Sequence, residues 1–358
     1  MNALVLGFFM ILIAAVAGGA FGLQYRIMRK YTVENSALLS LFFATIVVPL
    51  IACYYLLPNW TDAIAQVSFQ RNLAIFGFGF GWGLGAITYA YGFNILGMAL
   101  AASLLKGLTI ALGSGIPLIR HWNEIPADAR VVTIIGLAIL IVGTAYAGKA
   151  GIMREKELAA TGGDARNGTG TAVTKATGKL FLLGLMVCLF SGLLSAFVNL
   201  GYDLSDSLEE AMTAVAGGDD LAWKATLIRW MPMYWGGIAA LIIFMGGAMI
   251  KNGTWRNYIS PGTGRDFFVS SSMGIVHFFA QIPYGIGAYY LGSAIGTTVG
   301  WGVNIGIALI VATTIGFICG EWKNVSKAAF RTLIGGIIIL LVAMAMLAYA
   351  NSLTLPDA

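Results

Sequence analysis

The fold class of the chain follows from the stretch at residues 331–350, which reads RTLIGGIIILLVAMAMLAYA and has no charged residue after Arg331. About 20 apolar residues are enough for a helix to cross the hydrocarbon core of a bilayer. Nine further runs of this kind precede it, at residues 3–24, 36–57, 73–92, 98–119, 131–148, 180–201, 226–250, 267–290 and 297–319. The sequence therefore predicts an all-α membrane protein with ten transmembrane helices.

The composition of the chain agrees with this prediction. Of its 358 residues, 58% are hydrophobic and 10% are charged, whereas soluble proteins carry about 25% charged residues. The mean hydropathy is +0.83. Its three cysteines lie inside apolar runs without metal-ligand spacing. These values exclude a soluble enzyme, a nucleic-acid-binding protein and a disulfide scaffold. We expect the lipid bilayer as its surroundings, no nucleic-acid partner, no metal and no cofactor.

One long polar stretch, residues 149–179, divides the runs into two blocks of five. Its Gly-rich and basic composition is typical of a flexible cytoplasmic linker. We expect residues 1–148 to form a first five-helix repeat and residues 180–358 to form a second one. An odd number of helices in each half gives the halves opposite orientations, as in the inverted repeats of secondary transporters.

The positions of the basic residues predict which side of the membrane each loop faces. Of the 21 Lys and Arg residues, 15 lie in loops that follow odd-numbered runs and 5 lie on the other side. Loops rich in Lys and Arg stay in the cytoplasm. Both termini should therefore be periplasmic, and the net charge of +5 reports orientation rather than an acidic partner.

The third run contains a glycine-rich segment, Gly77-Phe78-Gly79-Phe80-Gly81-Trp82-Gly83-Leu84-Gly85. No strand or phosphate-binding lysine accompanies it, so a nucleotide loop is not favoured. Gly77, Gly81 and Gly85 recur at every fourth residue, which favours a small-residue ridge for close helix packing.

Two ionisable side chains lie deep inside the predicted spans. His277 is about ten residues into run 267–290, and Lys106 is about eight residues into run 98–119. Ionisable groups at this depth suggest a functional role, and imidazole exchanges a proton near neutral pH. His277 is either a proton carrier or a neutral core residue, and Lys106 either lines a cavity or reaches toward an interface. The carboxylates Asp203, Asp206 and Glu321 at the rims are the other candidate proton carriers.

Uncharged polar and aromatic side chains also recur at depth. Amides and hydroxyls pair with sugar hydroxyls, and an indole face covers the C–H face of a sugar ring, so this set suits a small neutral sugar carried with a proton. Each residue is otherwise a simple contact between helices. The candidate substrate-binding residues are Gln24, Trp82, Tyr89, Lys106, Ser191, Ser195, Asn199, His277, Gln281, Tyr284, Trp301 and Asn304.

Several motifs resemble one known family over nearly the whole chain. They are Trp82-Gly83-Leu84-Gly85-Ala86-Ile87-Thr88-Tyr89, Leu96-Gly97-Met98, Phe190-Ser191 with Ser195 and Asn199, Gln281, and Trp301 twenty residues before Glu321-Trp322-Lys323-Asn324. In this order they resemble the bacterial L-rhamnose–proton symporter family of the drug/metabolite transporter superfamily. The resemblance implies proton-driven uptake of a 6-deoxyhexose, a ten-helix inverted-repeat fold and a place in the inner membrane.

The chain departs from the family at Lys106 and His277, where we expect apolar residues, and at Asn304, where we expect His. L-Rhamnose, L-fucose, another 6-deoxyhexose and a pentose therefore all remain open as the substrate. The alternative is an exporter or exchanger of a small anionic or amphipathic metabolite, which Lys106 favours. An intramembrane enzyme is not expected, because no nucleophile, base and oxyanion donors converge. We expect a monomer or a weak homodimer.

Overall fold

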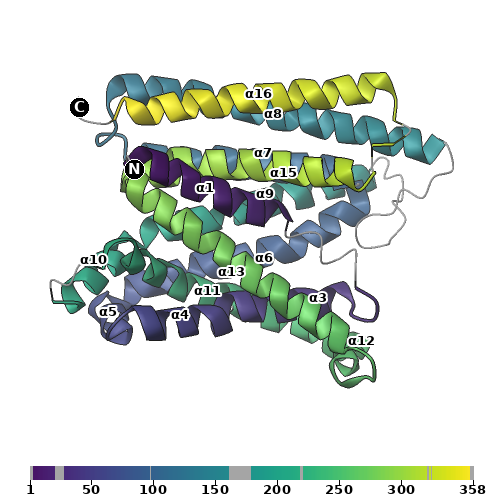
Figure 1. The fold of residues 1–358 in the computed structure, drawn as a ribbon. Coiled ribbons are helices and arrows are strands. Elements are labelled where there is room, and N and C mark those ends of the chain that lie inside the picture. The colour runs from purple at the N-terminus through teal and green to yellow at the C-terminus, as the bar shows by residue number, and fades with distance from the viewer. Residues whose placement is uncertain are drawn as a thin grey trace. The chain divides into compact units, whose positions relative to one another are not determined.

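The computed structural model describes residues 3–20, 28–96, 98–160, 179–217, 221–320, 322–323 and 325–354, without the side chains of residues 89–91, 93, 94, 98, 99, 159 and 293. Every regular element in these ranges is a helix, and they contain no strand (Figure 1). The predicted all-α fold is therefore confirmed.

The described part of each of the ten apolar runs is helical over most of its length. The elements in chain order are α1 (Ala3–Ala20), α3 (Val33–Phe42), η2 (Phe43–Val47), α4 (Val48–Leu56), α5 (Trp60–Gln66), α6 (Phe69–Leu96), α7 (Met98–Arg120), α8 (Ala127–Ala160), α9 (Lys179–Leu204), α10 (Asp206–Val215), η3 (Ala222–Trp230), α11 (Met231–Leu241), η4 (Ile242–Gly246), α12 (Gly247–Asn252), η5 (Thr254–Ile259), α13 (Gly264–Leu291), α14 (Ser293–Ile295), η6 (Gly296–Gly300), α15 (Trp301–Ile318) and α16 (Lys327–Ser352).

Eight helical segments in the described part of the chain are long and apolar enough to cross a membrane. Helices α6 and α13 are not among these eight, although each has 28 residues. At 1.5 Å per residue, that length also exceeds the thickness of the hydrocarbon core. The structure thus shows a multi-span helical protein, and the tenfold span count stays a prediction.

The predicted linker is helical at its beginning. Helix α8 continues through Ala160, so residues 149–160 extend a membrane helix instead of forming a loop. The segment Arg154-Glu155-Lys156-Glu157 explains this extension, because these residues are strong helix formers. The glycine-rich part of the predicted linker, residues 161–178, lies outside the described residues.

The chain folds into two compact units. The first unit contains Met1–Ile87 and Phe197–Ser293, and the second contains Thr88–Ala196 and Ala294–Ala358. Each unit therefore combines segments from both halves of the sequence. Helices α6 and α9 each contribute one part to the first unit and the other part to the second.

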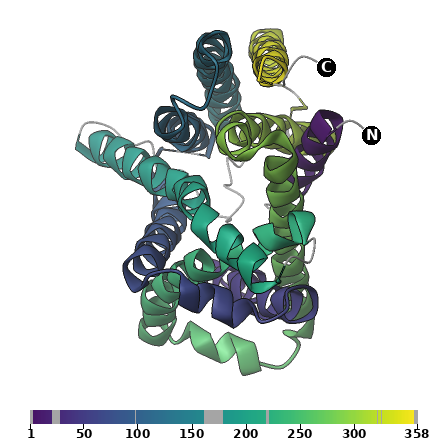
Figure 2. The same ribbon diagram turned by 90° about the vertical axis from the view of Figure 1, so that its left-hand side faces the viewer.

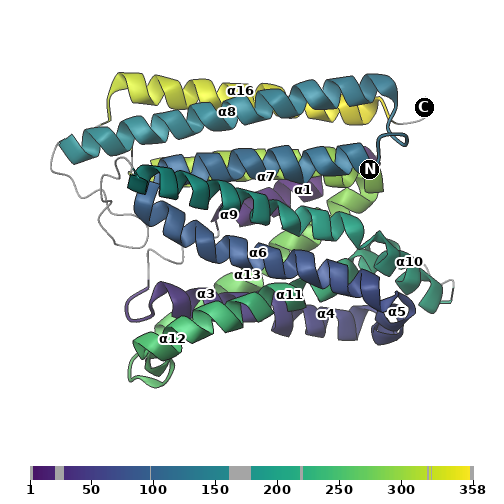
Figure 3. The same ribbon diagram turned by 180° about the vertical axis from the view of Figure 1, so that it is seen from behind.

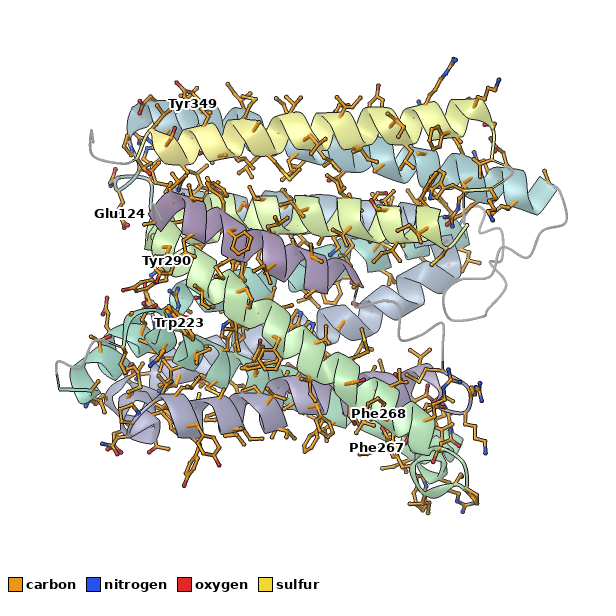
Figure 4. The ribbon with its side chains drawn as sticks, viewed as in Figure 1. Glu124, Trp223, Phe267, Phe268, Tyr290 and Tyr349 are labelled. Carbon is orange, nitrogen blue, oxygen red and sulfur yellow. The ribbon has the colours of Figure 1, made fainter. Side chains whose placement is uncertain are left out.

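Helix α13 organises the first unit, where it packs against α1, α3, η2 and η3 (Figure 1). Gly287 of α13 lies against Ile11 of α1, and Gly7 of α1 lies against Leu291 of α13. In Figure 4, Phe267 and Phe268 mark one end of α13, and Tyr290 marks the other end, on the side of Trp223 of η3. Helix α13 thus runs the length of this unit.

Helices α6 and α11 approach each other through glycines of both helices. A Cβ on Gly79 would lie 1.8 Å from the Met233 carbonyl oxygen, and one on Gly236 would lie 2.0 Å from that of Phe76. Gly83 likewise faces Gly237. A Cβ on Gly77, by contrast, would meet nothing within 4 Å. The expectation that Gly77 belongs to the packing ridge was wrong, because the contacting face of α6 carries Gly79 and Gly83.

Helices α8 and α16 lie side by side in the second unit (Figures 2 and 3). Gly143 and Gly136 of α8 receive Leu340 and Leu347 of α16. Helix α7 packs against α8 and against η6 and α15. Small residues let these helices approach closely, as is usual in membranes.

Asp266 fixes the beginning of α13 to the chain that precedes α3. Its carboxylate is 2% exposed and accepts hydrogen bonds from the backbone N–H groups of Lys30 at 2.6 Å, Tyr31 at 2.9 Å and Arg29 at 3.1 Å. Burial alone would raise the pKa of Asp266, but these three amides hold it below its usual value. Asp266 precedes the predicted membrane run 267–290, so this contact lies at the end of the span.

Replacing Asp266 with Asn should lower the free energy of unfolding at pH 7 by about 2 kcal/mol, the value of hydrogen bonds to a charged group. Because the pKa of Asp266 is lowered on folding, its contribution is complete above about pH 4, the unfolded carboxyl value. It is lost as the pH falls through the folded pKa. Denaturant titrations in detergent at pH 7 and pH 3 measure both effects.

The exposed carboxylate of Asp62 in α5 provides the control for this prediction. Asp62→Asn should unfold like the natural protein at either pH. A D266N protein that is as stable as the natural one at pH 7 would show that the three amides do not depend on the carboxylate.

Candidate substrate site

Five rings of the first unit form a continuous series, called the aromatic row here: His277, Trp82, Tyr234, Trp230 and Tyr202. Successive ring centroids are 6.4, 6.3, 5.4 and 4.4 Å apart. These distances match the spacing of attractive aromatic pairs. The row thus joins side chains of α13, α6, α11, η3 and α9.

Local helix geometry explains how the middle of the row forms. Trp230 and Tyr234 are four residues apart across the junction of η3 and α11, so their side chains lie on one face and their rings stack at 19°. Pro232 in the first turn of α11 suits a helix start, where a missing N–H costs nothing.

Trp82 and His277 form one end of the row. Their rings are nearly parallel, with an interplanar angle of 8°, and both residues are partly buried. Gly237 of α11 makes room for the indole, since a Cβ there would lie 2.8 Å from the ring of Trp82. This end places an indole face beside a side chain that can exchange a proton.

Arg229 closes the other end of the row. Its guanidinium lies 4.0 Å from the centroid of the Tyr202 ring and donates to the Tyr202 carbonyl oxygen at 2.7 and 3.2 Å. It also forms an ion pair with Glu209 of α10 at 3.0 Å. The neighbouring Asp203 is 4% exposed. The sequence counted Arg229 only as a loop charge, but it is 4% exposed and holds α10 to this end of the row.

A buried hydrogen bond lies next to the row. The Tyr284 hydroxyl of α13 donates to Asn199 Oδ1 of α9 at 2.5 Å, and both residues are fully buried. The Tyr284 ring contacts those of Tyr202 and Trp230, with centroids 5.6 and 6.2 Å away. This pair connects α13 to the end of α9 within the first unit.

The predicted substrate-binding residues divide between the two units. Trp82, Asn199, His277 and Tyr284 lie in or beside the aromatic row, and Gln281 lies one turn from His277 on α13 and is partly buried. Gln24 and Glu321 lie outside the described residues, as does the side chain of Tyr89. The others, Lys106, Ser191, Ser195, Trp301 and Asn304, belong to the second unit.

Within the second unit, Trp301 packs its indole against α7. A Cβ on Gly113 would lie 2.5 Å from Trp301 Nε1, and Trp301 is 4% exposed. Ser191 is fully buried, whereas Ser195 and Lys106 are partly buried. Asn304 Oδ1 is buried without a hydrogen-bond partner among the described residues.

Tyr202, Trp230 and Tyr234 were missed at the level of sequence. They lie in apolar runs or at their ends, where an aromatic ring counts as one more hydrophobic residue. The four-residue spacing of Trp230 and Tyr234 was the available signal, because it places two rings with polar atoms on one helix face.

Comparison with known proteins identifies the family. A family model described as "L-rhamnose-proton symport protein (RhaT)" matches residues 1–260. Relatives named "L-rhamnose-proton symporter" from Escherichia coli strain K12 and Pectobacterium carotovorum are 22% and 21% identical over 360 residues, and one from Citrobacter koseri is 21% identical over 359 residues. Each alignment covers 96% of both chains.

A solved structure titled "Crystal structure of protein" resembles the chain with a TM-score of 0.50 and 14% identity. It covers 96% of this chain and 98% of that chain, and at this identity the likeness concerns the fold alone. Because the family model matches residues 1–260 of 358, the chain belongs to the L-rhamnose-proton symport protein (RhaT) family, and with its eight candidate spans it is a multi-pass protein of the bacterial inner membrane.

Proposed function

We propose that the protein is a proton-coupled symporter that imports a 6-deoxyhexose such as L-rhamnose or L-fucose. The family and the names of its relatives support this function. The observation that carries it is the stack of Trp82 on His277, because it places a sugar-binding surface in contact with a group that can carry a proton.

The chemistry of the row suits a sugar. The indole face of Trp82 covers the C–H face of a pyranose ring, and the amide of Gln281 pairs with its hydroxyls. Asn199 and Tyr284 hold the neighbouring helix ends together through their hydrogen bond. The remaining candidates for sugar contact stay Gln24, Tyr89, Lys106, Ser191, Ser195, Trp301 and Asn304.

His277 is the proposed proton carrier. Protonation converts its ring into a cation beside the indole of Trp82, with 6.4 Å between the ring centroids. This charge acts on a sugar bound at the same indole. Protonation of His277 therefore changes the affinity for sugar, and bound sugar changes the affinity for the proton. Alternating access requires this differential affinity between the outward and inward states. Lys106 in α7 and the buried Asp203 are the second choices for the proton.

Inverted five-helix repeats with both termini periplasmic are part of the proposal. Helices α6 and α13, the third helices of the two halves, both have 28 residues, and Trp82 and His277 are each the fourteenth residue of their helix. The second spans of the two halves each contain a π-helical turn, η2 and η4. These matches support a common plan for the halves.

Replacing His277 with Ala should abolish accumulation of radiolabelled L-rhamnose driven by a pH gradient in proteoliposomes, while sugar exchange across the membrane continues. A protonophore should abolish accumulation by the natural protein in the same way. His121, which pairs with Glu124 at 2.9 Å in the second unit, supplies the control, and His121→Ala should accumulate sugar. Full accumulation by the H277A protein would remove His277 from the coupling step.

Lys106 favours a second function, the export or exchange of a small anionic metabolite. Lys106 is partly buried in α7, and its ammonium group would pair with a carboxylate. Inhibition of labelled L-rhamnose uptake by a sugar acid, but not by L-fucose, would favour this function over sugar import.

A further inference from the structure

Two polar atoms of the aromatic row are buried without a partner. Trp230 Nε1 and the Tyr234 hydroxyl belong to fully buried residues, and neither forms a hydrogen bond within the described part of the chain. The Tyr202 hydroxyl lies beside them, next to the side chain of Thr226, whose Oγ1 donates to the Trp223 carbonyl oxygen at 2.7 Å.

Such a concentration of unpaired atoms is unusual. Buried polar side chains in native proteins are nearly always hydrogen-bonded, and an unpaired one lowers stability. Phe at position 234 would keep the same ring packing without the hydroxyl. Because the rings pack well and their polar atoms do not pair, the hydrogen-bonding capacity is kept for a partner that is not part of the chain.

We propose that Trp230 and Tyr234, with Tyr202 beside them, form a hydroxyl-binding subsite for the transported sugar. This proposal rests on the function proposed above and extends the sugar site along the row from Trp82. The Trp230 N–H donates to a sugar oxygen, and each tyrosine hydroxyl both donates and accepts. A neutral polyhydroxylated molecule matches this combination of atoms.

Helix α13 offers a route for the sugar to reach the subsite. Tyr284 and Gly285 of α13 cover the subsite. A Cβ on Gly285 would lie 3.2 Å from the Tyr202 hydroxyl and 3.6 Å from Trp230 Nε1. Pro283 immediately before them removes the N–H that would bond the Phe279 carbonyl, which weakens the helix at that turn. Bending there carries Tyr284 and Gly285 away from the row.

The test removes one polar group at a time. Tyr234→Phe keeps the ring, whereas Trp230→Phe also reduces the indole to a phenyl ring. Trp230→Phe and Tyr234→Phe should bind L-rhamnose about tenfold more weakly than the natural protein, which is the loss expected for one good hydrogen bond. Without sugar, the melting temperature of Tyr234→Phe should be unchanged or higher, since only an unpaired buried atom is gone. That of Trp230→Phe should fall, because phenyl leaves a cavity where the buried indole packed. Radiolabelled L-rhamnose binding and thermal unfolding in detergent give the two values.

Tyr258→Phe is the matched control. The Tyr258 hydroxyl donates to the Asn35 carbonyl oxygen at 2.8 Å, away from the row and in the same unit. Its loss should lower the melting temperature and leave L-rhamnose affinity unchanged. Tyr234→Phe should therefore lower the affinity without lowering the melting temperature, and Tyr258→Phe should do the reverse.

Two outcomes overturn the proposal and can be told apart from failure of the function itself. If both row variants bind L-rhamnose as tightly as the natural protein does, the hydrogen-bond partner of these atoms is water and not the sugar. A lowered melting temperature with natural affinity, as in the control, would show a structural role. If the natural protein binds neither L-rhamnose nor L-fucose, the proposed function fails, and the sugar subsite fails with it.

Discussion

Replacing Gly79 with Ala is expected to prevent α6 from packing against α11 and to abolish recovery of folded protein. The new Cβ would lie 1.8 Å from the Met233 carbonyl oxygen and 2.6 Å from its carbonyl carbon. Both are backbone atoms inside a helix, so the helices must separate to accept the methyl group. The free energy of unfolding should fall by more than about 3 kcal/mol, which is above the usual range for an overpacked core.

Gly77→Ala is the control for this result, because a Cβ at Gly77 would meet nothing within 4 Å. Both changes add one methyl group to the same helix, and Ala is the better helix former. Size-exclusion chromatography of detergent-solubilised protein should give natural yields for the G77A protein and almost none for G79A. Equal yields would show that α6 and α11 do not meet at Gly79.

Replacing Arg229 with Ala should lower the free energy of unfolding by about 3 kcal/mol, the lower end of the range for removing one partner of a buried ion pair, because Glu209 is partly exposed. Glu209 would keep its charge without a counter-ion. The Tyr202 carbonyl would lose two donors at 2.7 and 3.2 Å. Denaturant unfolding of the purified variant measures this loss.

Two further variants separate the causes of the Arg229 effect. Arg229→Lys keeps the charge but not the paired donors, so it should recover part of the stability. Glu209→Gln combined with Arg229→Ala should be less destabilising than the sum of the single changes, because no unpaired charge remains. Strict additivity would show that the ion pair contributes nothing.

Hydropathy was sufficient to locate the long helices, because the described part of every apolar run is helical over most of its length. It did not locate α5, α10 or the extension of α8 through Ala160. It could not show which helix face meets a neighbour. Gly77 and Gly79 lie two residues apart and each stands between two phenylalanines. Only Gly79 nevertheless faces α11. Contact faces depend on tertiary packing between residues far apart in sequence, here residue 79 and residue 233.

The candidate site could be predicted where polar side chains lie inside apolar runs, because such residues are unusual in membrane-spanning helices. Asn199, His277 and Tyr284 drew attention for this reason, and the structure places them together in the first unit. Trp230 and Tyr234 did not, since their polar atoms are single groups on large apolar rings. The buried role of Arg229 was also hidden, because a charge near a predicted helix end is normally exposed.

The division of each unit between distant parts of the chain has a consequence for biosynthesis. The first unit needs both Met1–Ile87 and Phe197–Ser293, and about 200 residues separate its first segment from its last residue. At roughly 5–20 residues per second, the ribosome delivers that residue some 10–40 seconds after residue 87. Helix α11 ends at Leu241, so the glycine face of α6 lies in the membrane without α11 for roughly the first 8–30 seconds of this interval. A holding partner at the insertion site would protect the nascent chain during that time.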